Sequence, residues 1–133
     1  MPIRWGDMDA MMHVNNTVYF RYAEQARIEW VESWGHSASG ESVESVVVAN
    51  VACEFLRPLK YPGKVHLRMY VTEPGRTSIP TSFDMRRTDE IASHGEAAPI
   101  VARGTALMVW INNATGRPTA LPDGVRAKLL ASQ

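Results

Sequence analysis

The chain has 133 residues, of which 45% are hydrophobic and 21% charged, and its formal net charge at pH 7 is zero. This length predicts one domain over residues 1–133, and the balanced charge argues against nucleic acid as a partner, because duplex-binding proteins usually carry a basic excess. The single cysteine, Cys53, excludes an internal disulfide and the paired cysteines of a typical zinc site.

The first part of the chain predicts a short strand, a loop and a long helix. Residues 2–6 alternate in polarity as a strand does, and residues 7–15 are typical of an irregular loop. Over residues 17–34, apolar side chains recur at steps of one, three and four, which predicts a helix with one buried side. Two asparagines supply capping chemistry before this helix, and Gly35 stands where a terminating glycine is expected.

The rest of the chain is typical of strands joined by short turns. A loop is expected over 36–41 and another over 89–99, strands over 43–57, 64–73, 77–88 and 100–111, and a short helix over 121–130. Pro80 inside the third of these strands predicts a sheet edge or a bulge, since proline cannot donate to a ladder. Segregated elements of this kind indicate an α+β fold with one long helix lying across a five-stranded antiparallel sheet.

The segment before the long helix carries the residues best suited to chemistry. Asp7 and Asp9 are two residues apart, so an extended backbone would point both carboxylates the same way. The helix start that follows has backbone N–H groups without intrahelical partners. A carboxylate beside free N–H donors is the minimum equipment for acyl transfer. The same Asp-x-Asp spacing also suits turn and capping chemistry, and a metal site of Asp7, Asp9 and His13 is a further alternative.

Residues 4–35 resemble the 4-hydroxybenzoyl-CoA thioesterase-like branch of the hotdog-fold superfamily. The resemblance lies in the stretch WGDMDAMMHVNNTVYFRYAEQARIEWVESWG and continues through CEFLRPLKYPGKVHLRMYV, GRTS and VARGTALMVWINNATGRPTALP, so it covers nearly the whole chain. It implies a hotdog fold, in which the sheet wraps around the helix, and an enzyme that hydrolyses an acyl-CoA thioester to a free acid and CoA.

The resemblance also implies roles for residues of the first motif. Asp9 matches the catalytic carboxylate, which acts either as a nucleophile or as a general base on water. The backbone amide of Asn16 matches the donor that polarises the thioester carbonyl. His13 either orients water or the thioester, or fills the loop, and Asp7 organises the loop. Met12 stands where the family usually has glycine, which adds bulk near the acyl site.

Four further residues match positions that could bind CoA. They are Arg57, Lys60, Arg76 and Ser78, although hairpin tips carry such residues routinely. No cofactor or resident metal is implied, because CoA is part of the substrate. A homodimer or homotetramer is implied, with sites at the subunit interface. Glu24 is a second candidate carboxylate, for which an ion pair with Arg27 is a sufficient explanation.

Two other functions fit the same pattern. One is a hotdog hydratase or dehydratase, although its Asp and His motif is not found here. The other is a non-catalytic module that binds acyl-CoA or an acyl carrier protein, and Met12 in place of the usual glycine is the feature that favours it. The first residues lack the pattern of a signal peptide, and no apolar run has the length to span a bilayer. We therefore expect a cytoplasmic protein with no membrane partner.

Overall fold

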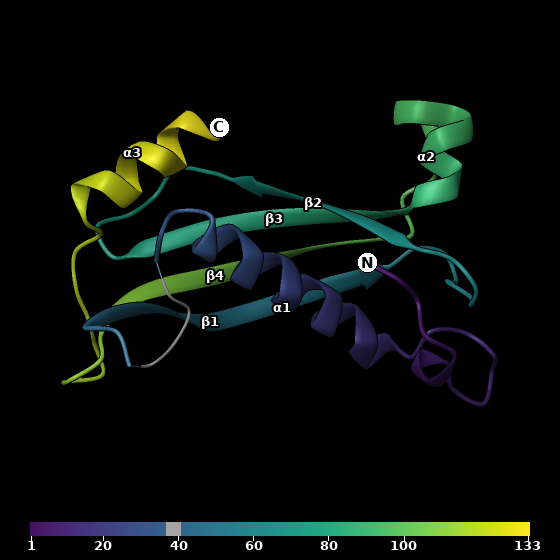
Figure 1. The fold of residues 1–133 in the computed structure, drawn as a ribbon, viewed down its shortest axis with the longest axis horizontal. Coiled ribbons are helices and arrows are strands. Elements are labelled where there is room, and N and C mark those ends of the chain that lie inside the picture. Colours follow the sequence, from purple (N-terminus) through teal and green to yellow (C-terminus); the bar gives the residue numbers. More distant parts are fainter. Residues whose placement is uncertain (37–40) are drawn as a thin grey trace. The chain divides into compact units, whose positions relative to one another are not determined.

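The structure is a computed structural model that describes residues 1–36 and 41–133. Figure 1 labels its helices and strands along the chain. The elements are η1 (Trp5–Asp7), α1 (Asn16–Glu32), β1 (Glu44–Phe55), β2 (Val65–Val71), β3 (Ser78–Arg87), α2 (Thr88–His94), η2 (Gly95–Ala97), β4 (Ala102–Asn112), β5 (Arg117–Pro118) and α3 (Asp123–Ala131). The loop predicted over 36–41 falls mostly outside the described residues.

The strands form one antiparallel sheet of five strands in the order β1-β4-β3-β2, with the short β5 paired to β4. The predicted α+β architecture with one long helix and a five-stranded antiparallel sheet is therefore confirmed. The four long strands lie where the sequence predicted them, and so do α1 and α3. Consecutive strands β2, β3 and β4 are neighbours, whereas β1 pairs with β4 and leaves its other side at the edge of the sheet.

The predicted N-terminal strand over 2–6 is wrong. Pro2 makes an isolated bridge to Lys64, and the 3-10 helix η1 begins three residues later, at Trp5. The reason is local, because the Arg4 N–H donates to the Asp7 carboxylate (2.8 Å) and the Asp7 N–H donates to the Arg4 carbonyl (3.0 Å). Such side-chain bonding to the backbone competes with strand pairing. The fifth strand of the sheet is β5 instead, on the C-terminal side of β4.

Two predictions about β3 and the segment after it are also corrected. Of the two structures predicted at Pro80, a sheet edge or a bulge, the edge is wrong, because β3 runs between β4 and β2. The Pro80 carbonyl accepts the Thr72 N–H (3.1 Å) just past the end of β2. The segment predicted as a loop over 89–99 begins with helix α2. Its acidic first turn suits the helix dipole, and Gly95 ends it at a positive φ of 56°. An exposed helix without an apolar stripe gives no periodic signal.

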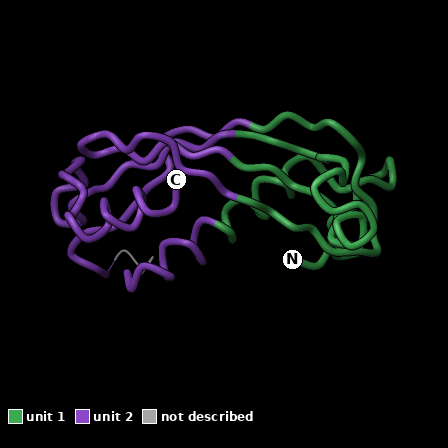
Figure 2. The backbone as a smooth tube through the Cα atoms, turned by 90° about the horizontal axis from the view of Figure 1, so that it is seen from above, with its two compact units in different colours: residues 1–26, 53–68, 83–104 green, residues 27–52, 69–82, 105–133 purple. Residues whose placement is uncertain are grey.

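The contacts of the chain divide it into two compact units, coloured separately in Figure 2. Unit 1 comprises residues 1–26, 53–68 and 83–104, and unit 2 comprises residues 27–52, 69–82 and 105–133. Each unit has its own buried core. The core of unit 1 includes Ile3, Val14, Tyr19, Tyr22, Ala23, Leu59, Val65, Phe83, Met85, Val101 and Ala102. The core of unit 2 includes Val31, Trp34, Val71, Ile79, Met108, Trp110, Leu121, Val125 and Leu129.

Candidate active site

The segment before α1, in unit 1, is an ordered turn rather than an irregular loop. Met8 and Val14 form an antiparallel bridge, and the Asp9 N–H donates to the His13 carbonyl (2.9 Å). The Met12 N–H donates to the Asp9 carbonyl (2.9 Å), and the φ angle of Met12 is 60°. This left-handed conformation is the reason a glycine suits the position, and Met12 adopts it at a cost of about 1–2 kcal/mol.

Asp9 lies at the start of this turn with its carboxylate half-buried. Oδ1 accepts the Met11 N–H at 2.9 Å, which is the turn chemistry that Asp-x-Asp spacing also predicts. Within the described residues, Oδ2 has no hydrogen-bond donor. One oxygen therefore fixes the carboxylate, and the other is available to a water or an acyl carbon.

Asp7 has partners of its own, so the two carboxylates are not an equivalent pair. Asp7 closes η1 instead of continuing an extended strand, and its Oδ2 accepts the Arg4 N–H (2.8 Å) and the Tyr22 hydroxyl (3.1 Å). Burial raises the pKa of the Tyr22 phenol well above its ordinary value, and the Asp7 charge raises it further, so the phenol stays protonated and donates. The Asn15 N–H donates to the Asp7 carbonyl (2.9 Å). These bonds tie η1 to α1.

The N-terminus of α1 leaves one backbone donor open. Asn15 caps the helix, since its Oδ1 accepts both the N–H and the hydroxyl of Thr17 (2.9 and 2.8 Å). The Val18 N–H donates to the Asn15 carbonyl (2.9 Å). The N–H of Asn16, at the first helical position, has no acceptor in the part of the chain that the structure describes. It is therefore placed as a free donor seven residues after Asp9, at the positive end of the helix dipole.

Two further candidates, His13 and Glu24, make no side-chain hydrogen bond to Asp9 or Asn16 among the described residues. His13 is half-exposed in the turn, and its carbonyl accepts the Asp9 N–H (2.9 Å). Glu24 forms an ion pair with Arg21 (3.3 Å), three residues before it, and not with the predicted partner Arg27, three residues after it. Arg27 is instead buried, with 8% of its surface exposed.

The four residues predicted to bind CoA fall in different units. Arg57 and Lys60 lie in unit 1, on the exposed segment between β1 and β2. The Val14 N–H donates to the Leu59 carbonyl (2.7 Å), so this segment is attached directly to the turn that carries Asp9. Arg76 and Ser78 lie in unit 2, at the turn between β2 and β3. The Ser78 hydroxyl fills the space that a Cβ on Gly75 would occupy, and the Gly75 N–H donates to the Ser78 carbonyl (2.9 Å).

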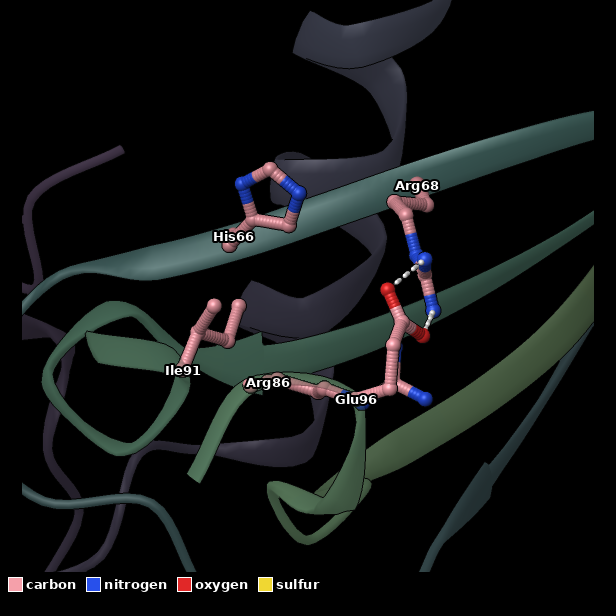
Figure 3. Close-up of a pocket in the computed structure, with 6 residues that line it drawn as sticks. His66, Arg68, Arg86, Ile91 and Glu96 are labelled. Atoms are coloured by element: carbon pink, nitrogen blue, oxygen red, sulfur yellow. Dashed lines mark hydrogen bonds and ion pairs between the residues drawn. The ribbon is translucent and has the colours of Figure 1, made fainter. Parts of the chain in front are cut away.

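Two cavities in unit 1 involve basic side chains. The larger, of about 300 Å³, is lined by Arg57, Pro58, Arg87, Glu90, Pro99 and Val101. The smaller, of about 50 Å³, is shown in Figure 3 and is lined by His66, Arg68, Arg86, Ile91, Gly95 and Glu96. In the smaller cavity Glu96 binds the Arg68 guanidinium through both oxygens (2.9 and 3.1 Å). That contact lowers the pKa of the Glu96 carboxyl.

Sequence reasoning missed three residues of this region, Tyr22, Arg87 and Glu90. Tyr22 counted only as part of the apolar helix stripe, and its hydroxyl bond to Asp7 spans 15 residues of chain. Arg87 and Glu90 flank the start of α2, which was predicted as a loop. The acidic pair at positions 89 and 90 was a helix-start signal that could have located α2.

The profile of the Thioesterase-like superfamily matches residues 3–129, across both units. The chain belongs to this superfamily. The predicted family resemblance, a hotdog-fold thioesterase, is thereby confirmed, and the hotdog fold agrees with solved structures of similar proteins.

Three similar proteins show the range within this superfamily. The PA2801 protein of Pseudomonas aeruginosa is 32% identical, with 97% of this chain and 94% of that chain covered and a TM-score of 0.87. A thioesterase of Thermus thermophilus, solved in complex with coenzyme A and Zn, is 26% identical, with 97% and 93% covered and a TM-score of 0.80. The chloroplastic acyl-acyl carrier protein thioesterase ATL3 of Arabidopsis thaliana is 28% identical over 98% of this chain, which spans 65% of the length of ATL3.

Two further observations concern metal ligands and membrane-spanning helices among the described residues. No three His, Cys, Asp or Glu side chains converge there as the ligands of a metal ion would. None of the described helices combines the length and apolar character needed to cross a bilayer.

Proposed function

We propose that this protein hydrolyses an acyl-CoA thioester to a free acid and CoA, with Asp9 as the reacting carboxylate and the Asn16 amide as the oxyanion donor. The observation that carries the proposal is the pairing, among the described residues, of an Asp9 oxygen without a donor and an Asn16 N–H without an acceptor. Asp9 lies in the hydrogen-bonded turn that precedes α1 and Asn16 is the first residue of α1, both in unit 1 of a Thioesterase-like superfamily member.

Two routes are compatible with this arrangement. In the nucleophilic route, Asp9 Oδ2 attacks the thioester carbon and the C–S bond breaks, so that CoA leaves as a thiolate and takes a proton from water. Water then hydrolyses the resulting anhydride to the free acid and the Asp9 carboxylate. In the general-base route, Asp9 takes a proton from a water that attacks the same carbon, and the thiolate leaves and is protonated. In both, negative charge develops on the carbonyl oxygen, where the Asn16 N–H and the helix dipole stabilise it.

The surrounding residues have supporting roles in this proposal. Asp7 holds the start of the turn through Arg4 and Tyr22, which positions Asp9 without contacting substrate. His13 borders the site and is available to orient water. Arg57 and Lys60, and Arg76 with Ser78 in unit 2, are the candidate contacts for CoA. No separate cofactor is needed for hydrolysis.

We also propose that the protein works as a homodimer or homotetramer in the cytoplasm. The supporting observation is β1, an edge strand whose residues are exposed along most of its length. Val47, Val48 and Val51 are 41%, 43% and 38% exposed on this edge. An apolar edge with unpaired backbone groups is a hazard unless another strand covers it.

The test of Asp9 is the release of free thiol from aromatic, short-chain and long-chain acyl-CoAs. We expect the wild type to cleave part of this panel and Asp9→Asn to lose about 10²-fold or more in rate, the range for a lost acid–base or nucleophilic group. Asp123→Asn, an exposed aspartate in the first turn of α3, is the matched control and keeps the wild-type rate. Equal rates for wild type and Asp9→Asn would make Asp9 structural and Glu24 the next residue to change.

The test of the oxyanion donor uses the position of Asn16. Proline is accepted at the first position of a helix and has no N–H, so Asn16→Pro removes the donor and keeps α1. We expect a loss of about 10²-fold in kcat, as for other oxyanion-hole donors. Asn16→Ala keeps the backbone N–H and serves as the control. If both variants behaved alike, the amide would have no part in the reaction.

A further inference from the structure

Methionine is concentrated in the turn that carries Asp9. The chain has seven methionines, and three of them stand within five residues, at positions 8, 11 and 12. Met11 is 74% exposed and Met12 is 56% exposed, whereas Met85 and Met108 are at most 1% exposed in the two cores. The remaining three are half-buried. The two most accessible thioethers of the chain are therefore neighbours in the turn before α1.

Neither backbone conformation nor burial accounts for the methionine at position 12. Its φ of 60° lies in the left-handed region, which strains a residue with a Cβ and which glycine adopts without strain. More than half of its surface is exposed, so its side chain adds little to the core of unit 1. What methionine has at this position, and glycine lacks, is a reactive thioether.

An exposed thioether is oxidised to a sulfoxide by hydrogen peroxide. The sulfur attacks one peroxide oxygen, an S–O bond forms and the O–O bond breaks. The leaving hydroxide takes the proton of the transferred hydroxyl, so the peroxide ends as water and the sulfur has lost two electrons. Methionine sulfoxide reductases reverse the step with two thiols, which end as a disulfide while the oxygen leaves as water. The modification is therefore reversible.

The backbone N–H groups of these two methionines hold Asp9 in place. The Met11 N–H donates to Asp9 Oδ1 and the Met12 N–H donates to the Asp9 carbonyl (both 2.9 Å). A thioether is a weak acceptor, whereas a sulfoxide is a polar group with a strong acceptor oxygen. On the same residues, that oxygen competes for the two N–H groups, as other polar side chains compete with backbone bonds in turns. Oxidation therefore loosens the turn that fixes Asp9.

Cys53 is the oxidisable sulfur of the chain that does not belong to a methionine. It is half-buried in β1, where it packs against the core of unit 1 and its thiol donates to the Glu54 carbonyl (3.8 Å). Burial raises the pKa of the Cys53 thiol, and the Glu54 charge raises it further. Because the thiolate is the form that reacts, Cys53 is a poor target for peroxide at neutral pH.

We propose that Met11 and Met12 form an oxidation site, at which sulfoxide formation by hydrogen peroxide reversibly lowers the hydrolysis rate by loosening the Asp9 turn. The inference rests on the proposed function, since the regulated step is the one assigned to Asp9. Glycine at position 12, which is usual in the family that this chain resembles, would leave one thioether of the two. The site is therefore a property of this chain's own turn.

The first test treats the wild type with hydrogen peroxide, removes the peroxide, and measures peptide masses and thiol release on the same sample. We expect one added oxygen on Met11 and on Met12 before any on Met85 or Met108. The rate should fall about tenfold, the effect of losing one hydrogen bond, and methionine sulfoxide reductase should restore it. Sulfoxides at both positions with an unchanged rate would overturn the proposal.

Variants identify the sulfur that is responsible. Met11→Leu combined with Met12→Leu removes both thioethers with little change in volume, and we expect this double variant to keep the wild-type rate before and after treatment. Met69→Leu, at a half-buried position of β2, is the matched control and loses its rate as the wild type does. Cys53→Ala should lose it too, and protection by Cys53→Ala alone would mean that the cysteine is the target and the proposal is wrong.

Amide hydrogen exchange separates this inference from the hydrolysis itself. The measurement needs no substrate, and NMR should show that the Met11 and Met12 N–H groups exchange about tenfold faster in the sulfoxide form than in the reduced protein. Faster exchange in a protein that releases no thiol from any thioester would refute the proposed function and keep the oxidation site. Unchanged exchange in a protein that does hydrolyse thioesters would refute the loosened turn and keep the function.

Discussion

Unit 2 has a core of large apolar side chains, whereas unit 1 combines its core with an exposed polar turn. In unit 2, Trp110, Ile79 and Met108 are at most 1% exposed, and α3 covers them with Leu129. In unit 1, the buried Tyr22 uses its hydroxyl to hold Asp7. The same helix α1 and strands β1 to β4 run through both units.

The difference shows how one set of elements serves two purposes. Apolar burial in unit 2 supplies free energy of folding that does not depend on fine geometry. The hydrogen bonds of unit 1 contribute less free energy each, but they fix where Asp9 and the Asn16 N–H lie. We therefore expect changes in unit 2 to act on stability and changes in the turn of unit 1 to act on catalysis.

The largest effect on stability is expected at Trp110. Trp110→Ala removes a side chain that is 1% exposed, and it removes the donor to the Glu44 carboxylate (2.6 Å). The expected loss in the free energy of unfolding is about 3–5 kcal/mol in urea titration. Leu107→Ala, at a 37% exposed position of the same strand, should cost less than about 1 kcal/mol. If Trp110→Ala lowered kcat at a temperature where the variant is folded, the expectation that unit 2 acts on stability and not on catalysis would be wrong.

A second effect is expected at Gly63, beside the larger cavity of unit 1. Its φ is +148°, and a Cβ there would overlap the Arg87 guanidinium. Gly63→Ala should therefore lower the free energy of unfolding by about 1–3 kcal/mol. Gly124→Ala in α3 meets no atom within 4 Å and should be neutral or stabilising by up to about 1 kcal/mol. Similar values for the two variants would show that Arg87 does not hold this backbone in place.

A smaller effect, with a pH signature, is expected at Tyr22. Tyr22→Phe removes one donor to Asp7 and should cost about 1 kcal/mol near pH 8. Because folding raises the pKa of the Tyr22 phenol, the unfolded chain ionises first, so this contribution is present below the ordinary tyrosine pKa of about 10 and is lost as pH rises above it. Urea unfolding at about pH 8 and about pH 10.5 measures the free energy of unfolding of wild type and variant, and we expect their difference to be smaller at the higher pH.

Kinetics of the same variant sharpen the comparison between the units. We expect Tyr22→Phe to lower kcat with little change in KM, because it loosens Asp7 and hence the turn carrying Asp9. Tyr61→Phe, at a 45% exposed position of unit 1, is the control and changes neither quantity. A fall in stability without any fall in kcat would mean that the Asp7–Tyr22 bond only supports the fold.

The smallest effect is expected at Met12, which has a φ of 60°. Met12→Gly should raise the free energy of unfolding by about 0.5–1 kcal/mol, since glycine has no Cβ to strain the left-handed conformation. Met11→Gly, at the neighbouring exposed position, should lower it by a similar amount through added freedom of the unfolded chain. Thermal unfolding of the pair decides this, and a destabilised Met12→Gly would show that the methionine side chain is needed for packing.

The sequence by itself determined the elements that depend on contacts close along the chain. The apolar periodicity over 17–34 and the cap at Asn15 located α1. The Val-rich run over 43–57 and the strand patterns over 64–73, 77–88 and 100–111 located the four long strands. The helix start was also readable, because the capping oxygen of Asn15 and the Thr17 N–H that donates to it are two residues apart.

The tertiary structure decided what depends on residues far apart in sequence. The place of β3 inside the sheet, the bond from Tyr22 to Asp7, and the cavity that joins Arg57 to Glu90 all bring together residues separated by more than ten positions. No local pattern encodes such contacts, because they form only when burial of the two cores has fixed the backbone. The failed N-terminal strand is an exception with a local cause, since alternation in five residues could not outweigh the Asp7 carboxylate bound to the Arg4 N–H three residues away.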